Sequence, residues 1–337
     1  MRYPKFIQKG DFFAVTAPSA GIVDKEKLME YENAIVNIRN MGFEFLETPN
    51  VRTDQQGRSS SAEERAKQFM QVWEKKEVSA IICAAGGDFA CEMLDYLDFE
   101  HLKKMEPKWL QGFSDITNLG FVFTTNLDIA TIYGENIRDY GMRELSKNLT
   151  DSFEFMQGNE VIQKSFGAYE PKDDERKTFE PYHLSEPITW KNGNGEVKNK
   201  FSGRCIGGCF DVIVNLIGTK YDKIGEYIEK YKNDGIVWFL DVYEMSTPQV
   251  LCHLWQMKNA GYFAHCKGII FGRPCYIRED YEMSFAQAIK EAIGDLQIPF
   301  ILDADVGHIP PQMPIVNGAI LEVTCENGEG EIRTFLR

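Results

Sequence analysis

The chain has 337 residues, which suggests two domains and is ample for hydrophobic cores. Its composition, 43% hydrophobic and 26% charged, is ordinary for a globular protein. A net charge of -14 argues against nucleic acid or an anionic membrane surface as a partner, so we expect neither.

Targeting and redox signals are also absent from the pattern. The amino terminus has no apolar core or small-residue cleavage site, and no window approaches the roughly 18 apolar residues of a membrane span. The eight cysteines are scattered without a CxxC pair, and no histidine stands near Cys205 and Cys209 at zinc-finger spacing. We therefore expect reduced thiols in a cytoplasmic protein.

Short apolar runs alternate with helical patterns through the first half of the chain. The pattern predicts strands at residues 12–17, 43–47, 78–84 and 129–133, and helices at 25–41, 61–75 and 89–97. Alternation at this spacing predicts a mostly parallel α/β sheet.

The second half begins with a change in composition. Residues 166–200 are charged and contain three prolines, which indicates a connection and an edge hairpin around Asn192–Gly195. Further on, helices are predicted at 209–216 and 247–260, and strands at 235–241, 268–272, 300–302 and 319–323. We therefore predict an N-terminal domain at 1–165, a linker at 166–184 and a C-terminal domain at 185–337.

The stretch Gly112-Phe113-Ser114-Asp115-Ile116 has the small residue two positions before a serine that a nucleophile turn needs. It lacks the second glycine of the G-x-S-x-G motif. A nucleophile would stand on a sharp turn between a strand and a helix, facing the helix N-terminus. A helix N-cap is the alternative, and it is a frequent role for serine. Spacing alone favours the cap.

A second turn, Gly86-Gly87-Asp88, directly follows a predicted strand. Two glycines there let backbone N–H groups point at an anion or an oxyanion, although a plain strand-to-helix turn explains them equally well. No Gly-Lys-Ser/Thr follows, and the G-x-G-x-x-G spacing is missing, so no nucleotide cofactor is indicated.

Two acids and one histidine complete the set of candidates. Asp241 ends a predicted strand, where α/β folds place functional groups, and Glu244 follows three residues later. In isolation, a helix N-cap or a solvated acid is the favoured alternative for Asp241. His308 lies between a glycine and a proline-rich loop, a setting for a general base. Asp303 and Asp305 near it could suggest a metal site, but the ligands are too few to favour one. A serine, an acid and a histidine favour a hydrolase without settling it.

Five blocks, in chain order, carry a resemblance to a known family: CAAGGDFACEMLDYLDF, GFSDITNL, GRCIGGCFDVIVNLIGT, WFLDVYEMSTPQVLCHLWQMKNAGYF and VGHIPPQMPI. In that order they resemble the LD-carboxypeptidases, serine peptidases that include the microcin-immunity peptidases. The resemblance implies a triad in which Ser114 is the nucleophile and His308 the base. The acid position, in register with Leu254-Trp255, holds Asp241 where the family usually has glutamate. Glu244 is the alternative acid.

The same resemblance implies the rest of the site. Oxyanion donors would be the backbone N–H groups of Asp115, Gly87 and Asp88, and Cys209 stands where the family usually has asparagine. It implies a Rossmann- or flavodoxin-like N-terminal domain, a swivelling-type mixed α/β C-terminal domain, a homodimer, and no cofactor or metal.

The typical substrate implied is a murein tetrapeptide, which loses its terminal D-alanine during cell-wall recycling. One alternative is hydrolysis of peptidyl- or aminoacyl-nucleotide analogues, as in microcin immunity. Another is an inactive muropeptide-binding protein, suggested by the changes at Asp241 and Cys209.

Overall fold

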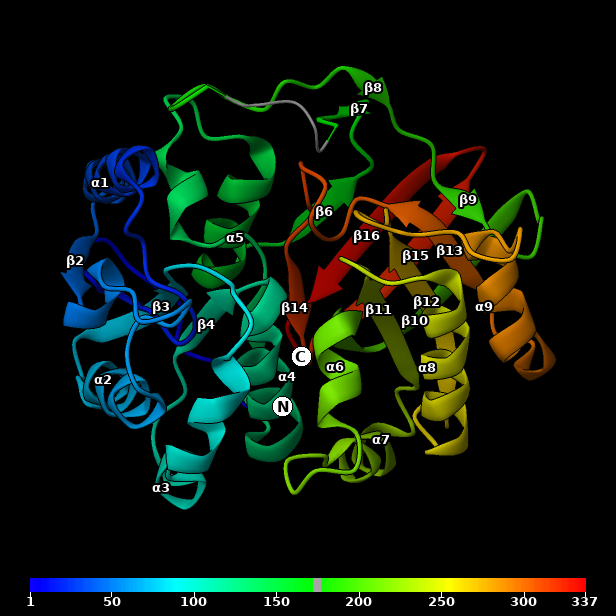
Figure 1. The fold of residues 1–337 in the computed structure, drawn as a ribbon, viewed down its shortest axis with the longest axis horizontal. Helices are drawn as coiled ribbons and strands as arrows, with labels where there is room; N and C mark the ends of the chain where they lie inside the picture. The colour runs from blue at the N-terminus through cyan, green and yellow to red at the C-terminus, as the bar shows by residue number, and fades with distance from the viewer. Residues whose placement is uncertain (172–176) are drawn as a thin grey trace. The chain divides into compact units, whose positions relative to one another are not determined.

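The computed structural model describes residues 1–171 and 177–337 (Figure 1). The predicted linker 166–184 includes residues 172–176, which lie outside the described residues. The chain divides into two compact units that are not continuous in sequence. The first contains Met1–Asn159, a short stretch ending at Tyr182, and Pro314–Asn317. The second contains the intervening segment from Glu160, then His183–Met313 and Gly318–Arg337.

The first unit is built on a six-stranded sheet with the order β14-β5-β4-β3-β1-β2. Its strands are β1 (Phe12–Thr16), β2 (Glu44–Glu47), β3 (Val78–Cys83), β4 (Trp109–Gly112), β5 (Thr131–Tyr133) and β14 (Ile315–Asn317). All neighbouring pairs are parallel except β14 with β5. The edge strand β14 thus comes from near the end of the chain.

Local capping signals explain where the helices of the first unit begin. The helices are α1 (Lys25–Asn40), α2 (Ala62–Glu74), α3 (Phe99–Lys104), α4 (Thr117–Leu127) and α5 (Lys147–Gln157). The Asp24 carboxylate accepts from two backbone N–H groups at the start of α1, and the Ser61 hydroxyl accepts from that of Glu64 at the start of α2. The helix predicted at 89–97 is instead a 3₁₀ helix, Ala90–Tyr96.

Aromatic side chains fill the core between the helices and this sheet. Phe69 stacks on Trp73, and both rings meet the Phe123 ring edge-on, with centroids 5.3 to 5.7 Å apart. All three side chains are fully buried. Helices cover the strands, which explains why β1 and β3 are near-continuous apolar runs rather than alternating ones.

The second unit is built on an eight-stranded sheet with the order β6-β16-β15-β10-β11-β12-β13-β9. Its strands are β6 (Val161–Lys164), β9 (Lys191–Asn192), β10 (Lys198–Cys209), β11 (Ile236–Asp241), β12 (Cys266–Gly272), β13 (Phe300–Ala304), β15 (Ile320–Glu326) and β16 (Glu329–Phe335). Strands β10 to β13 are parallel, and the pairs outside them are antiparallel. A separate pair joins β7 (Ala168–Tyr169) to β8 (Glu186–Pro187).

The helices of the second unit are α6 (Phe210–Leu216), α7 (Ile224–Tyr231), α8 (Thr247–Asn259) and α9 (Phe285–Ile293). Helices α6 and α8 lie in front of strands β10 to β12 in Figure 1. A capping box between Ser246 and Gln249 fixes the start of α8. Every residue of β11 is buried, as its apolar sequence requires. Two mixed α/β units, the first with a mostly parallel sheet, confirm the fold class predicted from the sequence.

Strand β10 runs through residues that the sequence assigns partly to a connection. Its twelve residues include Gly207, where an added Cβ would lie 1.9 Å from the Phe239 carbonyl oxygen on β11. Glycine is therefore needed for close approach of the two backbones, although it reads as a turn signal. The short strand β9 is at the sheet edge as predicted, but it pairs with β13 rather than forming a hairpin.

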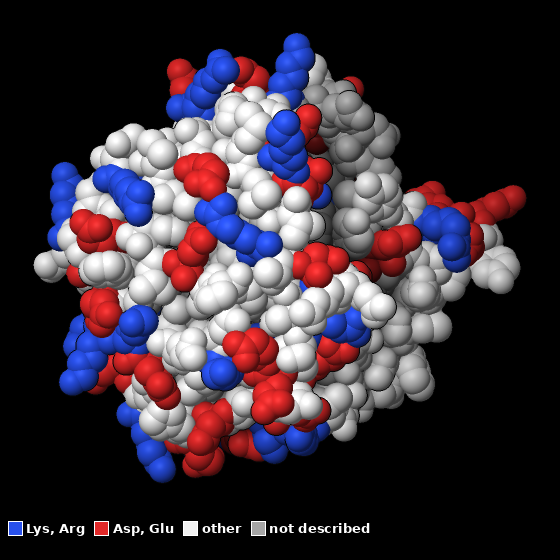
Figure 2. All heavy atoms as spheres, turned by 60° about the vertical axis from the view of Figure 1, so that its left-hand side comes forward, with Lys and Arg blue, Asp and Glu red and all other residues white. Residues whose placement is uncertain are grey.

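The surface carries charges of both signs. Figure 2 turns forward the side that bears α1, and there basic and acidic side chains are interspersed over the part of the surface that is not grey. Among the described residues, no helix has the length and apolar character needed to cross a membrane.

Candidate active site

Ser114 stands on the turn between β4 and α4 of the first unit. Its φ is +61°, a left-handed conformation that non-glycine residues rarely adopt. A 3₁₀ turn, Ser114–Ile116, follows, and α4 begins only at Thr117 with Ile116 as its N-cap. Ser114 therefore does not cap α4. A strained serine on a sharp strand-to-helix turn has the backbone geometry of a nucleophile elbow.

The Gly86-Gly87 turn after β3 lies against this serine. A Cβ added to Gly86 would be 3.0 Å from the Ser114 Cβ, so the two turns meet at van der Waals contact only because residue 86 is glycine. Gly87 has a φ of +146°, and both Gly87 and Asp88 are exposed. The residues predicted as oxyanion donors thus stand on two adjacent turns of one unit.

A buried carboxylate connects these turns to each other. Asp115 is 3% exposed, and its Oδ2 accepts hydrogen bonds from the Ser19 hydroxyl and, at 2.8 Å, from the Ala90 backbone N–H. Its Oδ1 accepts from Asn118 Nδ2 at 2.8 Å. Because the Ala90 N–H closely follows the Gly86-Gly87 turn, the side chain of Asp115 fixes that turn relative to Ser114.

The Asp115 carboxyl group makes the free energy of unfolding depend on pH. Burial raises the pKa of Asp115 above its ordinary value of 3.8, so the folded protein retains that proton more tightly than the unfolded chain. The stability from this group is therefore present below pH 3.8 and declines as pH rises through the folded-state pKa. Asp115→Asn cannot ionise. Urea unfolding at a series of pH values should show wild type losing free energy of unfolding relative to this variant as pH rises; a constant difference would contradict it.

In the second unit, the side chains of Asp241 and His308 are in close polar contact. Asp241 ends β11 and is fully buried, and His308 lies in the loop after β13. The His308 Nδ1 and Asp241 Oδ2 atoms are 2.7 Å apart. When Nδ1–H donates to the carboxylate, the basic nitrogen of the imidazole is Nε2. The pair can therefore accept a proton from a hydroxyl group and return it.

Both halves of the chain match a known peptidase family. Residues 13–134 match the LD-carboxypeptidase N-terminal domain, and residues 202–323 match the LD-carboxypeptidase C-terminal domain. Together these ranges cover well over half of the chain. The chain belongs to the LD-carboxypeptidase family. The resemblance seen in the sequence blocks is thereby confirmed, and the chain is a member of a peptidase family.

Relatives within the family carry two kinds of name. The chain is 22% identical over 320 residues to a probable murein peptide carboxypeptidase of Bacillus subtilis, covering 94% of this chain and 89% of that protein. It is 23% identical over 336 residues to the microcin C7 self-immunity protein MccF of Escherichia coli, covering 94% and 90%. The crystal structure of an MccF-like protein from Bacillus anthracis superposes with a TM-score of 0.82 at 21% identity, covering 100% of both chains.

The structure distinguishes the two candidate acids of this LD-carboxypeptidase family member. Glu244 is exposed, whereas Asp241 makes the contact with His308. The backbone N–H groups of Tyr243 and Glu244 both donate to the Asp211 carboxylate, at 2.9 Å each. Asp211 therefore holds the segment that follows Asp241. The sequence pattern gives no indication of that role.

The His308 ring also has an aromatic neighbour that the sequence did not identify. The Tyr243 ring packs on it with centroids 4.4 Å apart and planes tilted by 40°. The Tyr276 ring meets Tyr243 edge-on at 5.3 Å, and its backbone N–H donates to the Tyr243 carbonyl. Both tyrosines keep more than a third of their surface exposed. They form an aromatic surface beside the imidazole.

Cys209 stands at the end of β10, directly opposite Asp241 in the parallel register. It is 2% exposed, and burial raises the pKa of its thiol well above the ordinary range. A protonated thiol cannot replace the polar contacts of the amide that the resemblance in sequence implies at this position.

The acids near His308 do not form a metal site. Asp303 pairs with Lys191 at 2.7 Å, and Asp305 pairs with Arg273. Among the described residues, no group of three or more His, Cys, Asp or Glu side chains is arranged to hold a metal ion.

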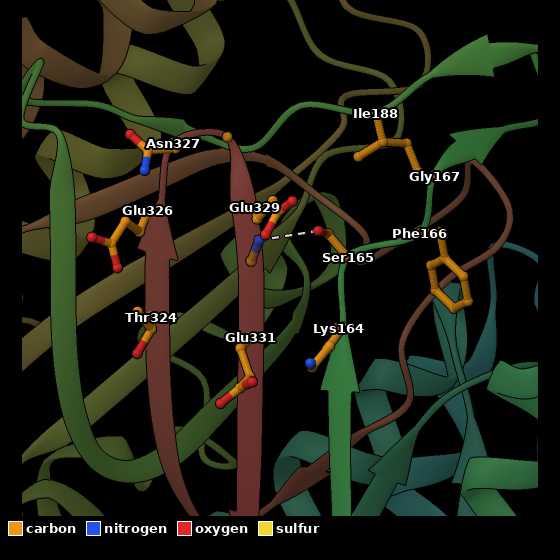
Figure 3. Close-up of a pocket in the computed structure, with 12 residues that line it drawn as sticks. Lys164, Ser165, Phe166, Gly167, Ile188, Thr324, Glu326, Asn327, Glu329 and Glu331 are labelled. Carbon is orange, nitrogen blue, oxygen red and sulfur yellow. Dashed lines mark hydrogen bonds between the residues drawn. The ribbon is translucent and has the colours of Figure 1, made fainter.

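The second unit also has a pocket of about 670 Å³ between the β15–β16 hairpin and the end of β6 (Figure 3). Glu326, Glu329 and Glu331 line one side, and Ser165 Oγ accepts from the Gly330 N–H at 3.0 Å. The lining includes none of the predicted site residues. The pocket is therefore not the candidate active site.

The sequence pattern missed Ser19 and Asn118, which bind the Asp115 carboxylate. The signal in the sequence that could have found Ser19 is its place just after a predicted strand. Ser19, Gly86 and Ser114 follow β1, β3 and β4, which are neighbours in the sheet order. The carboxyl ends of parallel strands share one edge of a sheet, which is where α/β folds place functional groups.

Gly307 gives a test of the acid's placement. Its φ is +111°, and an added Cβ would lie 1.9 Å from Asp241 Oδ1. Gly307→Ala must therefore displace the carboxylate, and we expect kcat to fall by about 100-fold or more. Gly261→Ala is the matched control because Gly261 also has positive φ, +82°, but no atom lies within 4 Å of its added Cβ. Steady-state kinetics of the two folded variants check the prediction, and equal losses of kcat would contradict it.

Proposed function

We propose that this protein is a serine-type LD-carboxypeptidase that hydrolyses the amide preceding a C-terminal D-amino acid in murein tetrapeptides. Ser114 is the nucleophile, His308 the general base and acid, and Asp241 the group that orients the imidazole. Backbone N–H groups of Asp115, Gly87 and Asp88 are the oxyanion donors. The pairing of His308 Nδ1 with the buried Asp241 carboxylate at 2.7 Å carries the proposal.

The reaction proceeds through an acyl-enzyme. Ser114 Oγ attacks the carbonyl carbon while His308 Nε2 takes the hydroxyl proton, and the oxyanion accepts from the backbone donors. The tetrahedral intermediate collapses, His308 gives the proton to the leaving amine, and the D-amino acid departs. Water then attacks the ester, gives a proton to His308, and releases Ser114 with its proton restored. Asp241 stabilises the imidazolium formed in both halves of the cycle.

Two features of the first unit support this assignment. The positive φ of Ser114 is a cost of roughly 1–3 kcal/mol that the surrounding structure must offset, and such strain concentrates at functional sites. The Asp115 carboxylate also holds the Gly-Gly turn against the serine turn, which pre-positions the predicted donors. Preorganised donors of this kind contribute a large share of the rate enhancement in acyl transfer.

A second candidate function is hydrolysis of aminoacyl- or peptidyl-nucleotide analogues, the activity suggested by the self-immunity relative. The observation that favours it is the exposed pair Tyr243 and Tyr276 beside His308. Tyrosine rings there can stack on a nucleobase, at about 1–3 kcal/mol for each base stacked.

One substrate panel separates these functions. The panel comprises a muramyl tetrapeptide, a D,D-pentapeptide and an aminoacyl-adenylate analogue, and we expect release of D-alanine from the tetrapeptide alone. Preferential cleavage of the adenylate analogue would favour the second function. Labelling with a serine-reactive phosphonate should modify Ser114 stoichiometrically; folded protein that is not labelled and cleaves nothing would indicate a muropeptide-binding protein instead.

A further inference from the structure

The loop that carries His308 is built around one arginine side chain. Arg273, directly after β12, is 6% exposed, and its guanidinium forms an ion pair with Asp305. The Nη2 group donates to the carbonyl oxygens of Ile309 and Pro311, at 3.1 and 3.4 Å. One planar group thus binds residues on both sides of His308.

Asp305, the partner of Arg273, makes several further contacts. It has no exposed surface, and its Oδ2 accepts from the Trp190 indole N–H at 2.9 Å and from the Phe166 backbone N–H at 3.1 Å. Its carbonyl oxygen accepts from the Met313 N–H at 2.6 Å. Figure 3 shows Phe166 just beyond the end of β6, so this contact ties the loop to a different part of the same unit. The Met313-to-Asp305 hydrogen bond thus joins the two ends of the loop that carries His308.

Stability alone is a poor explanation for this ion pair. Burial raises the pKa of the Asp305 carboxyl even though Arg273 acts in the opposite direction. Taking two charges out of water is costly, and apolar replacements are often equally stable. What an arginine adds is a rigid planar set of donors that fixes geometry, which lysine cannot reproduce.

We propose that Arg273 and Asp305 form a positioning pair that holds the His308 imidazole in register with Asp241. The inference rests on the proposed function, in which His308 transfers the proton. Neither residue reacts. Without the guanidinium the carbonyls of Ile309 and Pro311 lose their donor, and His308, between them and Asp305, loses its fixed position.

The test uses Arg273→Ala, Arg273→Lys and Lys191→Ala. Lys191→Ala is the matched control because it removes an exposed ion pair to Asp303, close to Asp305 in the chain. The first readout is the ring ¹⁵N chemical shifts of His308, assigned by comparison with His308→Gln, because they report the Nδ1–H tautomer without any substrate. The second is kcat and KM with the best substrate of the panel, and added millimolar guanidinium serves as chemical rescue.

In the wild type and in Lys191→Ala we expect the Nδ1–H tautomer. Arg273→Ala should show averaged ring shifts, and its kcat should fall by about 100-fold at nearly constant KM, as expected for roughly 1 Å of misplacement. Guanidinium should restore kcat in Arg273→Ala only. Arg273→Lys should fold and should also show averaged ring shifts and a lowered kcat. It therefore provides the test if the alanine variant does not fold.

Two results would overturn the inference: unchanged ring shifts in a folded Arg273 variant, or averaged shifts in the wild type. If the wild type cleaves no substrate while the Arg273 variants lose the tautomer, the proposed function fails and the positioning role stands. If the wild type is active and the Arg273 variants keep its ring shifts, the positioning role fails and the proposed function stands.

Discussion

Ser114→Ala is expected to lower kcat by about 10³- to 10⁶-fold, because removal of a triad nucleophile leaves only the contributions of binding and oxyanion stabilisation. The folded state should be retained, since alanine lacks only the hydroxyl group. Alanine can also adopt the positive φ of this turn at a cost similar to that of serine. Steady-state hydrolysis of the tetrapeptide, together with a thermal unfolding scan, measures both quantities.

Ser165→Ala is the control for this experiment. Ser165 lines the pocket of Figure 3, whose lining contains none of the predicted site residues, and its hydroxyl oxygen accepts from the Gly330 N–H. The change is therefore chemically the same at a serine outside the proposed triad. Its kcat should stay within about twofold of the wild-type value, as is usual for substitutions outside the machinery. Turnover retained by folded Ser114→Ala would show that another residue is the nucleophile.

The second large effect is expected at the acid. Asp241→Asn replaces the carboxylate that contacts His308 Nδ1 by an amide, which favours the wrong tautomer, and kcat should fall by about 10⁴-fold. KM should change little because Asp241 is fully buried behind the imidazole. The measurement is the full dependence of rate on substrate concentration for both proteins.

Two further variants make this prediction specific. Glu244→Gln should leave kcat nearly unchanged, because Glu244 is exposed and is not the partner of His308. Asp241→Glu should also lose activity, although the resemblance in sequence implies glutamate at this position. The reason is that the backbone of Gly307 lies so close to Asp241 Oδ1 that an additional methylene has little room. A fully active Asp241→Glu protein, or an inactive Glu244→Gln protein, would contradict the assignment.

The fold could be predicted where periodicity and capping agree. The strand at 12–17 is β1, and the helix at 25–41 is α1, with a boundary shift of one residue in each. The prediction was weaker where tertiary packing, rather than local sequence, determines the secondary structure. Strand β10 contains glycines that resemble a turn but allow close approach to β11. Strand β14 has three residues, too few for any period to be visible.

For the site, the sequence pattern proposes which side chains react but gives no indication of the residues that support them. Ser114, Asp241 and His308 follow strand ends or lie in a Gly-Pro loop, and such places can be recognised in a sequence. The supports are different. Asp211 and Arg273 act through backbone groups far away in the chain, and local sequence carries no record of such contacts. The contacts of these two residues can be recognised only in the three-dimensional structure.

Strand β14 has a consequence for dissecting the protein. It gives the first unit an antiparallel edge partner for β5 from a stretch that follows the His308 loop. A fragment cut after residue 165 would leave β5 as an open edge with unpaired N–H and C=O groups, a common start of aggregation. Reassembly by mixing the two halves, or a circular permutation, therefore has to supply Pro314–Asn317 to the first half. Although the two family domains can be told apart in the sequence, we expect that a cut between them does not give two independently stable pieces.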